Sequence, residues 1–80
     1  MPNYIVKNGG LIKTEILSNG DMSIEHTNSN LGDFISLICA AGRGHWNPTY
    51  RHWVVFAHSI DEAVRQIETI ATRNDYNGMP

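Results

Sequence analysis

Residues 11–26, with the sequence LIKTEILSNGDMSIEH, contain two short runs in which apolar and polar side chains alternate. In the first run positions 12, 14 and 16 are Ile, Thr and Ile, and in the second run positions 22 and 24 are Met and Ile. A period of two is typical of half-buried strands with one face in water. Asn19-Gly20 lies between the runs and suits a type I′ turn, which needs positive φ at both positions. The stretch predicts a β-hairpin, and Asn8-Gly9 predicts a shorter strand before it, over residues 4–6.

The sequence that follows the hairpin predicts a first helix. After a polar linker at residues 27–30, apolar side chains recur at helical spacing from Leu31 to Ala41, with Asn30 as the N-cap and Gly42 as the C-cap. Cys39 lies inside this apolar run, and we interpret it as a buried, unreactive thiol.

The second half of the chain predicts another hairpin, over residues 44–56, and a second helix. Asn47-Pro48 indicates a type I turn, because proline presets φ at the second position. Ser59 and Glu62 form the pattern of a capping box, and apolar residues then follow helical spacing to Ala71. Residues 74–80 are a polar tail that we expect to fray.

The order of these elements predicts an α+β fold. Two ββα units, ββαββα in all, would form one antiparallel sheet with both helices packed on one face. Eighty residues make a single domain, 1–80. One face of such a sheet stays open, and in so small a protein an open face indicates a homodimer or a ligand surface.

Composition narrows the class of protein. No apolar run approaches a membrane span, no signal peptide is visible, and one cysteine fits a reducing compartment, so we expect a cytoplasmic protein with no membrane partner. Residues 1–33 and 61–80 each carry a net charge of −2, whereas residues 34–60 contain no acid. This middle segment holds Arg43, Arg51 and three histidines. It is therefore the basic part of a mildly acidic chain.

The second hairpin is the best candidate for a binding surface. With Arg43 just before it, the hairpin brings together both tryptophans, two histidines and two arginines, and we predict that the contact residues are Arg43, His45, Trp46, Tyr50, Arg51, His52 and Trp53. Aromatic side chains could stack on a base or on a protein side chain, while the arginines could meet phosphates. The alternative is that Trp46 and Trp53 serve only to cover a thin core. The burial of Trp53 separates these two interpretations.

The Gly-x-Trp-Asn-Pro motif, with a second Trp seven residues after the first and a capped helix behind it, resembles the hairpin-plus-helix of HARP-type modules. The resemblance covers residues 31–72 and depends on Phe34, Gly44, Trp46, Asn47, Pro48, Arg51 and Trp53. HARP-type modules accompany annealing helicases and bind branched or partly single-stranded DNA. The resemblance therefore implies DNA binding by the hairpin.

Catalytic and cofactor signatures are absent from the sequence. No G-x-S-x-G, P-loop or paired-carboxylate pattern occurs, and His26, His45, His52 and His58 have none of the spacings typical of zinc ligands. We therefore predict that the protein is not an enzyme and binds neither a metal nor a cofactor.

Two functions remain open at this point. One is a small phage- or plasmid-type inhibitor of the anti-CRISPR-like class, whose acidic faces would meet a host protein or nucleoprotein complex that handles nucleic acid. The other is an accessory protein that binds single-stranded or branched DNA through the aromatic and basic hairpin. Small size and mild acidity favour the inhibitor.

Overall fold

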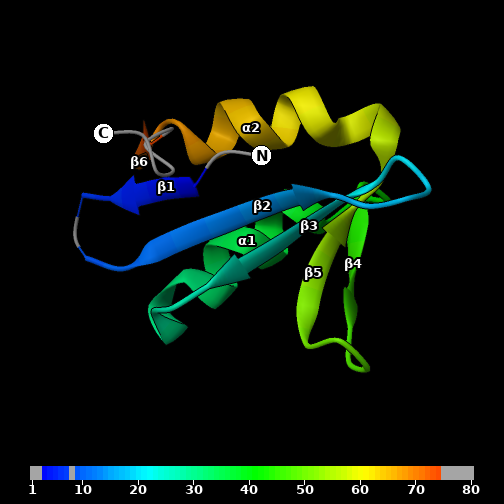
Figure 1. Ribbon diagram of the computed structural model, residues 1–80, viewed down its shortest axis with the longest axis horizontal. Helices are drawn as coiled ribbons and strands as arrows, with labels where there is room; N and C mark the ends of the chain where they lie inside the picture. Colours follow the sequence, from blue (N-terminus) through cyan, green and yellow to red (C-terminus); the bar gives the residue numbers. More distant parts are fainter. Residues whose placement is uncertain (1–2, 8, 75–80) are drawn as a thin grey trace.

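The computed structural model of this chain describes residues 3–7 and 9–74, and within them a six-stranded antiparallel sheet forms the core of the fold (Figure 1). The strands are β1 (Asn3–Val6), β2 (Leu11–Ile16), β3 (Met22–His26), β4 (Gly44–Asn47), β5 (His52–Val55) and β6 (Ala71–Asn74). Their order across the sheet is β4-β5-β3-β2-β1-β6.

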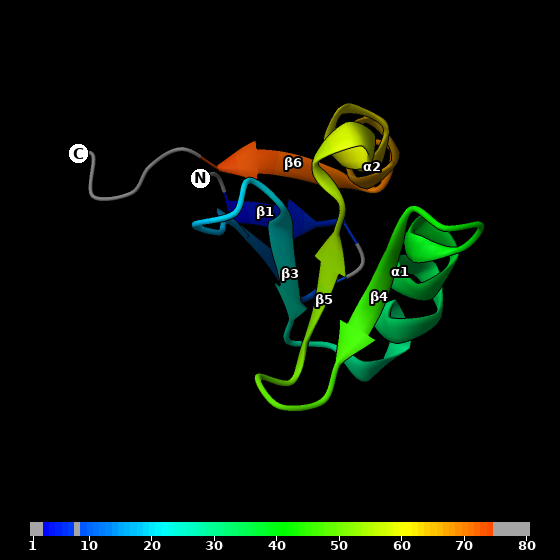
Figure 2. The ribbon, with the colours of Figure 1, turned by 90° about the vertical axis from the view of Figure 1, so that its right-hand side faces the viewer.

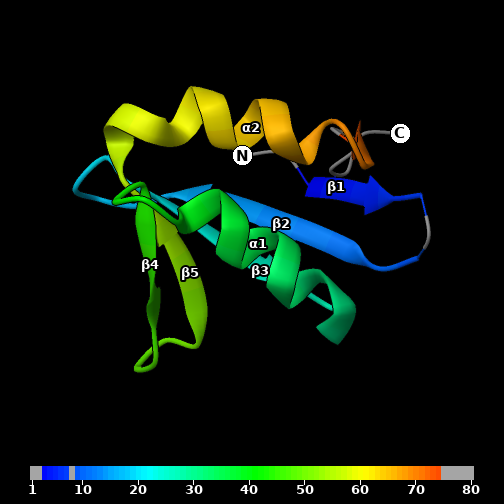
Figure 3. The same cartoon turned by 180° about the vertical axis from the view of Figure 1, so that it is seen from behind.

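Two helices, α1 (Gly32–Cys39) and α2 (Ile60–Ile67), cover one face of this sheet. Figure 2 shows both helices on the same side of the strands, and Figure 3 shows them from behind, in front of the sheet. Short 3₁₀ turns at Ser29–Leu31 and Ala57–Ser59 lead into the two helices. The predicted α+β class, with one antiparallel sheet and two helices on one face, is confirmed.

The alternation predicted for residues 11–26 sets the register of the central strands. Ile12, Met22 and Ile24 point to the helices and are fully buried, together with Tyr4, Ile35, Val55 and Ile67. Lys13 and Glu25 lie opposite each other on the other face. A slip of one residue would exchange these two sets, so burial of the apolar set specifies the register.

The turn between β2 and β3 differs from the expected type I′ turn. Leu17 and Asp21 close the turn through the Leu17 N–H bond to the Asp21 carbonyl, 2.7 Å, so three residues rather than two form the loop. Gly20 has positive φ, +96°, and Asn19 does not. A three-residue loop of this kind combines a type I turn with a glycine bulge, which needs one positive φ only.

The first helix has no asparagine cap of its own, because a 3₁₀ turn at Ser29–Leu31 precedes it and α1 begins only at Gly32, with Leu31 at the N-cap position and no side-chain cap bond. The asparagine that caps is Asn28 rather than Asn30, and it caps the 3₁₀ turn, since its side chain accepts from the Asn30 N–H at 2.9 Å. At the other end the helix stops at Cys39, and the chain turns through positive φ at both Ala41 and Gly42. Gly42 therefore ends the turn after the helix and not the helix itself.

The second helix is shorter than predicted, and a strand follows it. α2 ends at Ile67, and Ala71–Asn74 forms β6, which pairs with β1. The apolar residues Ile70 and Ala71 fit a helical pattern and a strand equally well. Pairing with β1, including the bond from Lys7 N–H to the Ile70 carbonyl at 3.1 Å, selects the strand. Asn74 thus ends a strand, and the rest of the predicted tail lies outside the described residues.

The capping box expected at the start of α2 does not form. Ser59 is buried and makes no side-chain cap bond, while Glu62 accepts from Arg65 and from Gln66 instead. Ser59 is the last residue of the 3₁₀ turn at Ala57–Ser59, and its φ of −115° and ψ of 5° are not the extended backbone of a typical N-cap. The backbone N–H of Ala57 is held by the Asp21 carboxylate at 2.9 Å, which joins this turn to the β2–β3 loop.

The close packing of α1 against the second hairpin predicts that Gly44 tolerates no side chain. A Cβ at this position would lie 2.2 Å from the Val54 carbonyl oxygen and 2.9 Å from Cys39 Sγ. We expect Gly44→Ala to lower the free energy of unfolding in urea by at least about 1–3 kcal/mol.

The matched control is Gly32→Ala, whose new Cβ would meet His26 at an ordinary 3.9 Å. Because alanine favours helix, this variant should keep or raise stability, by up to about 1 kcal/mol. Equal effects of the two substitutions would contradict the close approach at Gly44.

Candidate binding site on the second hairpin

The loop of the β4–β5 hairpin projects from one end of the sheet, away from both helices (Figure 1). The Asn47 side chain organises this loop: its Oδ1 accepts from the N–H groups of Thr49, at 3.0 Å, and Tyr50, at 3.3 Å. Arg51 has φ of +56°, so it takes the left-handed position that closes the loop. Asn-Pro therefore does form a turn here, with the asparagine acting through its side chain.

Strand alternation divides the predicted contact residues between the two faces of the hairpin. Trp46 and Trp53 are directly paired across β4 and β5 on the face that the helices cover, and their ring centroids lie 5.3 Å apart in an edge-to-face arrangement. Trp53 is half-buried and packs against the core. Trp46 lies farther out and exposes 43% of its surface. Trp53 thus helps to cover the core, whereas the contact role predicted for Trp46 stays a prediction.

The opposite face of the hairpin carries the two histidines. The His52 ring stacks on the ring of Tyr50, with centroids 5.8 Å apart, and its Nδ1 lies 3.9 Å from a carboxylate oxygen of Glu25. His45 packs against Phe56 at 5.5 Å. Tyr50 belongs to the loop and is the most exposed of these side chains, at 71%.

The two arginines have different surroundings. Arg43 precedes β4, and its Nε and Nη2 donate to the carbonyl oxygens of Ile38, at 3.0 Å, and Leu37, at 3.2 Å. These carbonyls belong to the last turn of α1, where a cation is favoured by the helix dipole. Arg43 therefore holds the helix end, whereas Arg51 is exposed in the loop.

Two hollows flank the hairpin. One, of about 250 Å³, is lined by Ile24, Glu25, His26, Trp46, Arg51 and Trp53. The other, of about 400 Å³, is lined by Leu17, Ser18, Asn19, Asn47, Tyr50 and His52. Sequence reasoning missed Glu25, His26 and the 17–19 loop as neighbours of the hairpin. They reach it only through the pairing of β3 with β5, for which no local signal exists.

Comparisons of the chain with protein-family models, with curated proteins and with solved structures find no match. Over the described residues, no cluster of three or more His, Cys, Asp or Glu side chains is arranged to hold a metal ion. No helix in the same part of the chain has the length and apolar character needed to cross a membrane.

Because Trp53 packs on the core and Trp46 is more exposed, we expect alanine at the two positions to lower the free energy of unfolding by different amounts. Trp53→Ala removes a ring that packs on the core and should lower the free energy of unfolding by about 2–4 kcal/mol. Trp46→Ala removes an exposed ring and its edge-to-face contact, and should cost no more than about 1.5 kcal/mol. Urea unfolding followed by circular dichroism measures both. Equal losses would contradict the division of roles.

The buried thiol of Cys39 should be unreactive in the folded protein. Burial raises its pKa to about 11, against a smaller opposite effect of Arg43. The ordinary value is 9.0, so folding disfavours the thiolate and stability should fall as the pH rises above about 9. A thiol reagent at pH 8 should modify Cys39 rapidly in urea and slowly without it; equal rates would show that the thiol is accessible.

Proposed function

We propose that this protein is a small, non-enzymatic binding protein that uses the projecting β4–β5 hairpin to bind another protein. The observation that carries the proposal is the joint exposure of Trp46, Tyr50 and Arg51 on one hairpin. Tryptophan, tyrosine and arginine are the residues most enriched among those that dominate the energy of protein interfaces. The pairing of β4 with β5 and the two bonds accepted by Asn47 order the hairpin before binding, which lowers the cost in conformational entropy.

The charge of the site supports a protein partner over a nucleic acid. Binding to the nucleic-acid backbone depends on several cations that neutralise phosphates. Arg43 donates to the carbonyls of α1, and Glu25 lies beside Trp53 and Arg51 in the smaller hollow. A surface with one exposed arginine and a nearby carboxylate suits the mixed contacts of a protein interface.

We further propose a partner class: a host protein or nucleoprotein complex that handles nucleic acid. The chain is acidic outside residues 34–60, and surfaces that bind nucleic acid are basic. Complementary charge speeds encounter and suppresses wrong partners. The role that fits is that of a phage- or plasmid-type inhibitor, of the anti-CRISPR-like class.

Binding of single-stranded or branched DNA is the second candidate. It is favoured by the hollow that Trp46, Trp53 and Arg51 share, where one base could stack on Trp46 while Arg51 meets a phosphate. The resemblance to HARP-type modules points the same way and stays a prediction.

The test of the protein-binding proposal compares three forms of the chain as bait on lysates of candidate bacterial hosts. The wild type should retain a defined partner, and Trp46→Ala combined with Tyr50→Ala should lose it. In a titration with the purified partner, the double variant should bind at least about 30-fold more weakly, since a dominant interface residue contributes about 2 kcal/mol or more.

Leu11→Ser is the matched control, because Leu11 is 47% exposed and lies on β2, away from the hairpin. It should bind as the wild type does. A parallel titration with single-stranded and forked DNA at two salt concentrations tests the second candidate. Salt-dependent DNA binding lost in the hairpin variant, with no protein partner retained, would overturn the protein-binding proposal.

A further inference from the structure

The outer surface of α1 is unusual for a helix in a small protein. Leu37 is 69% exposed, more than any other large aliphatic side chain described. Two exposed residues near it, Ser36 in the helix and Ala40 just after it, are short. A long apolar side chain between short ones forms a projection that a facing surface can receive.

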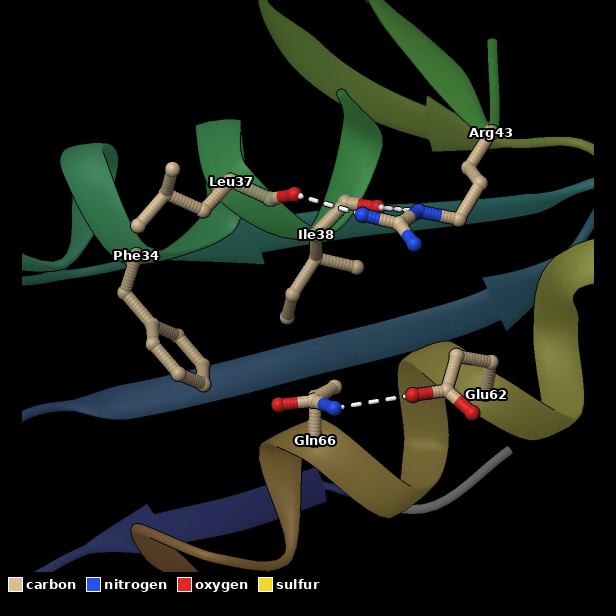
Figure 4. Close-up of a pocket in the computed structure, with 6 residues that line it drawn as sticks. All are labelled: Phe34, Leu37, Ile38, Arg43, Glu62 and Gln66. Carbon is tan, nitrogen blue, oxygen red and sulfur yellow. Dashed lines mark hydrogen bonds between the residues drawn. The ribbon is translucent and has the colours of Figure 1, made fainter. Parts of the chain in front are cut away.

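A cleft of about 310 Å³ lies beside this projection, between α1 and α2 (Figure 4). Its lining residues are Phe34, Leu37, Ile38, Arg43, Glu62 and Gln66. Figure 4 shows the Phe34 ring and the Ile38 side chain pointing from α1 toward α2, and Glu62 and Gln66 on the opposite wall. The wall from α1 is therefore apolar and the wall from α2 is polar.

We propose that a second copy of this chain covers this surface, so that the protein forms a homodimer through α1. The two α1 helices pack antiparallel about a twofold axis, and Leu37 of each copy enters the cleft of the other. The projection and the cleft belong to the same patch of one chain, which is the condition for a closed, self-complementary interface. The cleft has room for an aliphatic side chain beside Phe34 and Ile38.

The charges at the two ends of α1 support this occupant. Asp33 is exposed in the first turn, on the same side of the helix as Leu37, four residues later. Arg43 lies at the opposite end, where two of its five N–H donors are used by α1 carbonyls. An antiparallel pair of helices brings Asp33 of one copy to Arg43 of the other at both ends, and it also opposes the helix dipoles.

The polar wall of the cleft can accept the Leu37 side chain of a second copy. Glu62 accepts hydrogen bonds from Arg65 and Gln66 on its own helix, and the bond from Arg65 is the main cause that lowers the pKa of its carboxyl group. Its charge is thus paired within α2. None of Trp46, Tyr50 and Arg51 lines the cleft, so this surface is distinct from the hairpin site.

The test is sedimentation velocity over a concentration series from micromolar to millimolar, with circular dichroism to verify folding. The wild type should show a monomer–dimer equilibrium. Leu37→Glu should weaken dimerisation at least tenfold, since each copy loses the burial of one leucine and gains a charge in the interface. Leu37→Ala, which introduces no charge, should weaken it in the same direction.

Leu11→Glu is the matched control, an exposed leucine changed on the open face of the sheet. It should dimerise as the wild type does. Asp33→Lys should weaken the dimer, and added salt should weaken the wild-type dimer more than the Asp33→Lys dimer. A wild type that is monomeric throughout, a folded Leu37→Glu that dimerises normally, or a dimer broken by Leu11→Glu would each overturn the proposal.

Discussion

The rest of the structure depends on the position of β3 between β2 and β5. Its residues Met22 and Ile24 are fully buried against the helices. It pairs with β2 on one side and with β5 of the second hairpin on the other. The pairing of Ile24 with Thr14 on one side and Trp53 on the other determines which face each side chain of β5 occupies. Because the side-chain period of a strand is two, a single register error here would turn Trp53 outward and His52 inward.

The second hairpin has four paired residues on each strand. Its base packs against the rest of the fold, and its end is exposed to solvent. Its base is locked to the helices: Gly44 packs against Cys39, and Arg43 binds the last carbonyls of α1. Its end is shaped by Asn47 and by the left-handed Arg51, and there the aromatic side chains are open to solvent. A contact surface supported in this way loses little conformational freedom on binding, which is the physical reason that the hairpin suits recognition.

The two proposed interactions use two separate surfaces of the protein. The hairpin carries polar and aromatic groups that suit a foreign partner, and α1 carries a projection and a cleft that suit a second copy. The open face of the sheet, which the sequence had indicated as the place of a homodimer or ligand, exposes Ile5 and Leu11 but buries Ser23 and Val54. A dimer through α1 would leave both that face and the two hairpin ends accessible.

Local patterns in the sequence determined the two hairpins, both helices and the α+β class, because alternation, helical spacing and Asn-Gly or Asn-Pro turns act between near neighbours. Only the tertiary structure decided that the helix ends at Ile67 and that Ala71 begins a strand beside β1, since the apolar pair Ile70 and Ala71 fits either element until a partner strand is present. The same is true of the site. The sequence grouped Arg43 with Trp46 and Arg51, but in the structure the Arg43 guanidinium donates to a carbonyl at the end of α1. Strand β3 places Glu25 and His26 beside the hairpin instead. Contacts of this kind join residues far apart in the chain, and no local pattern records them.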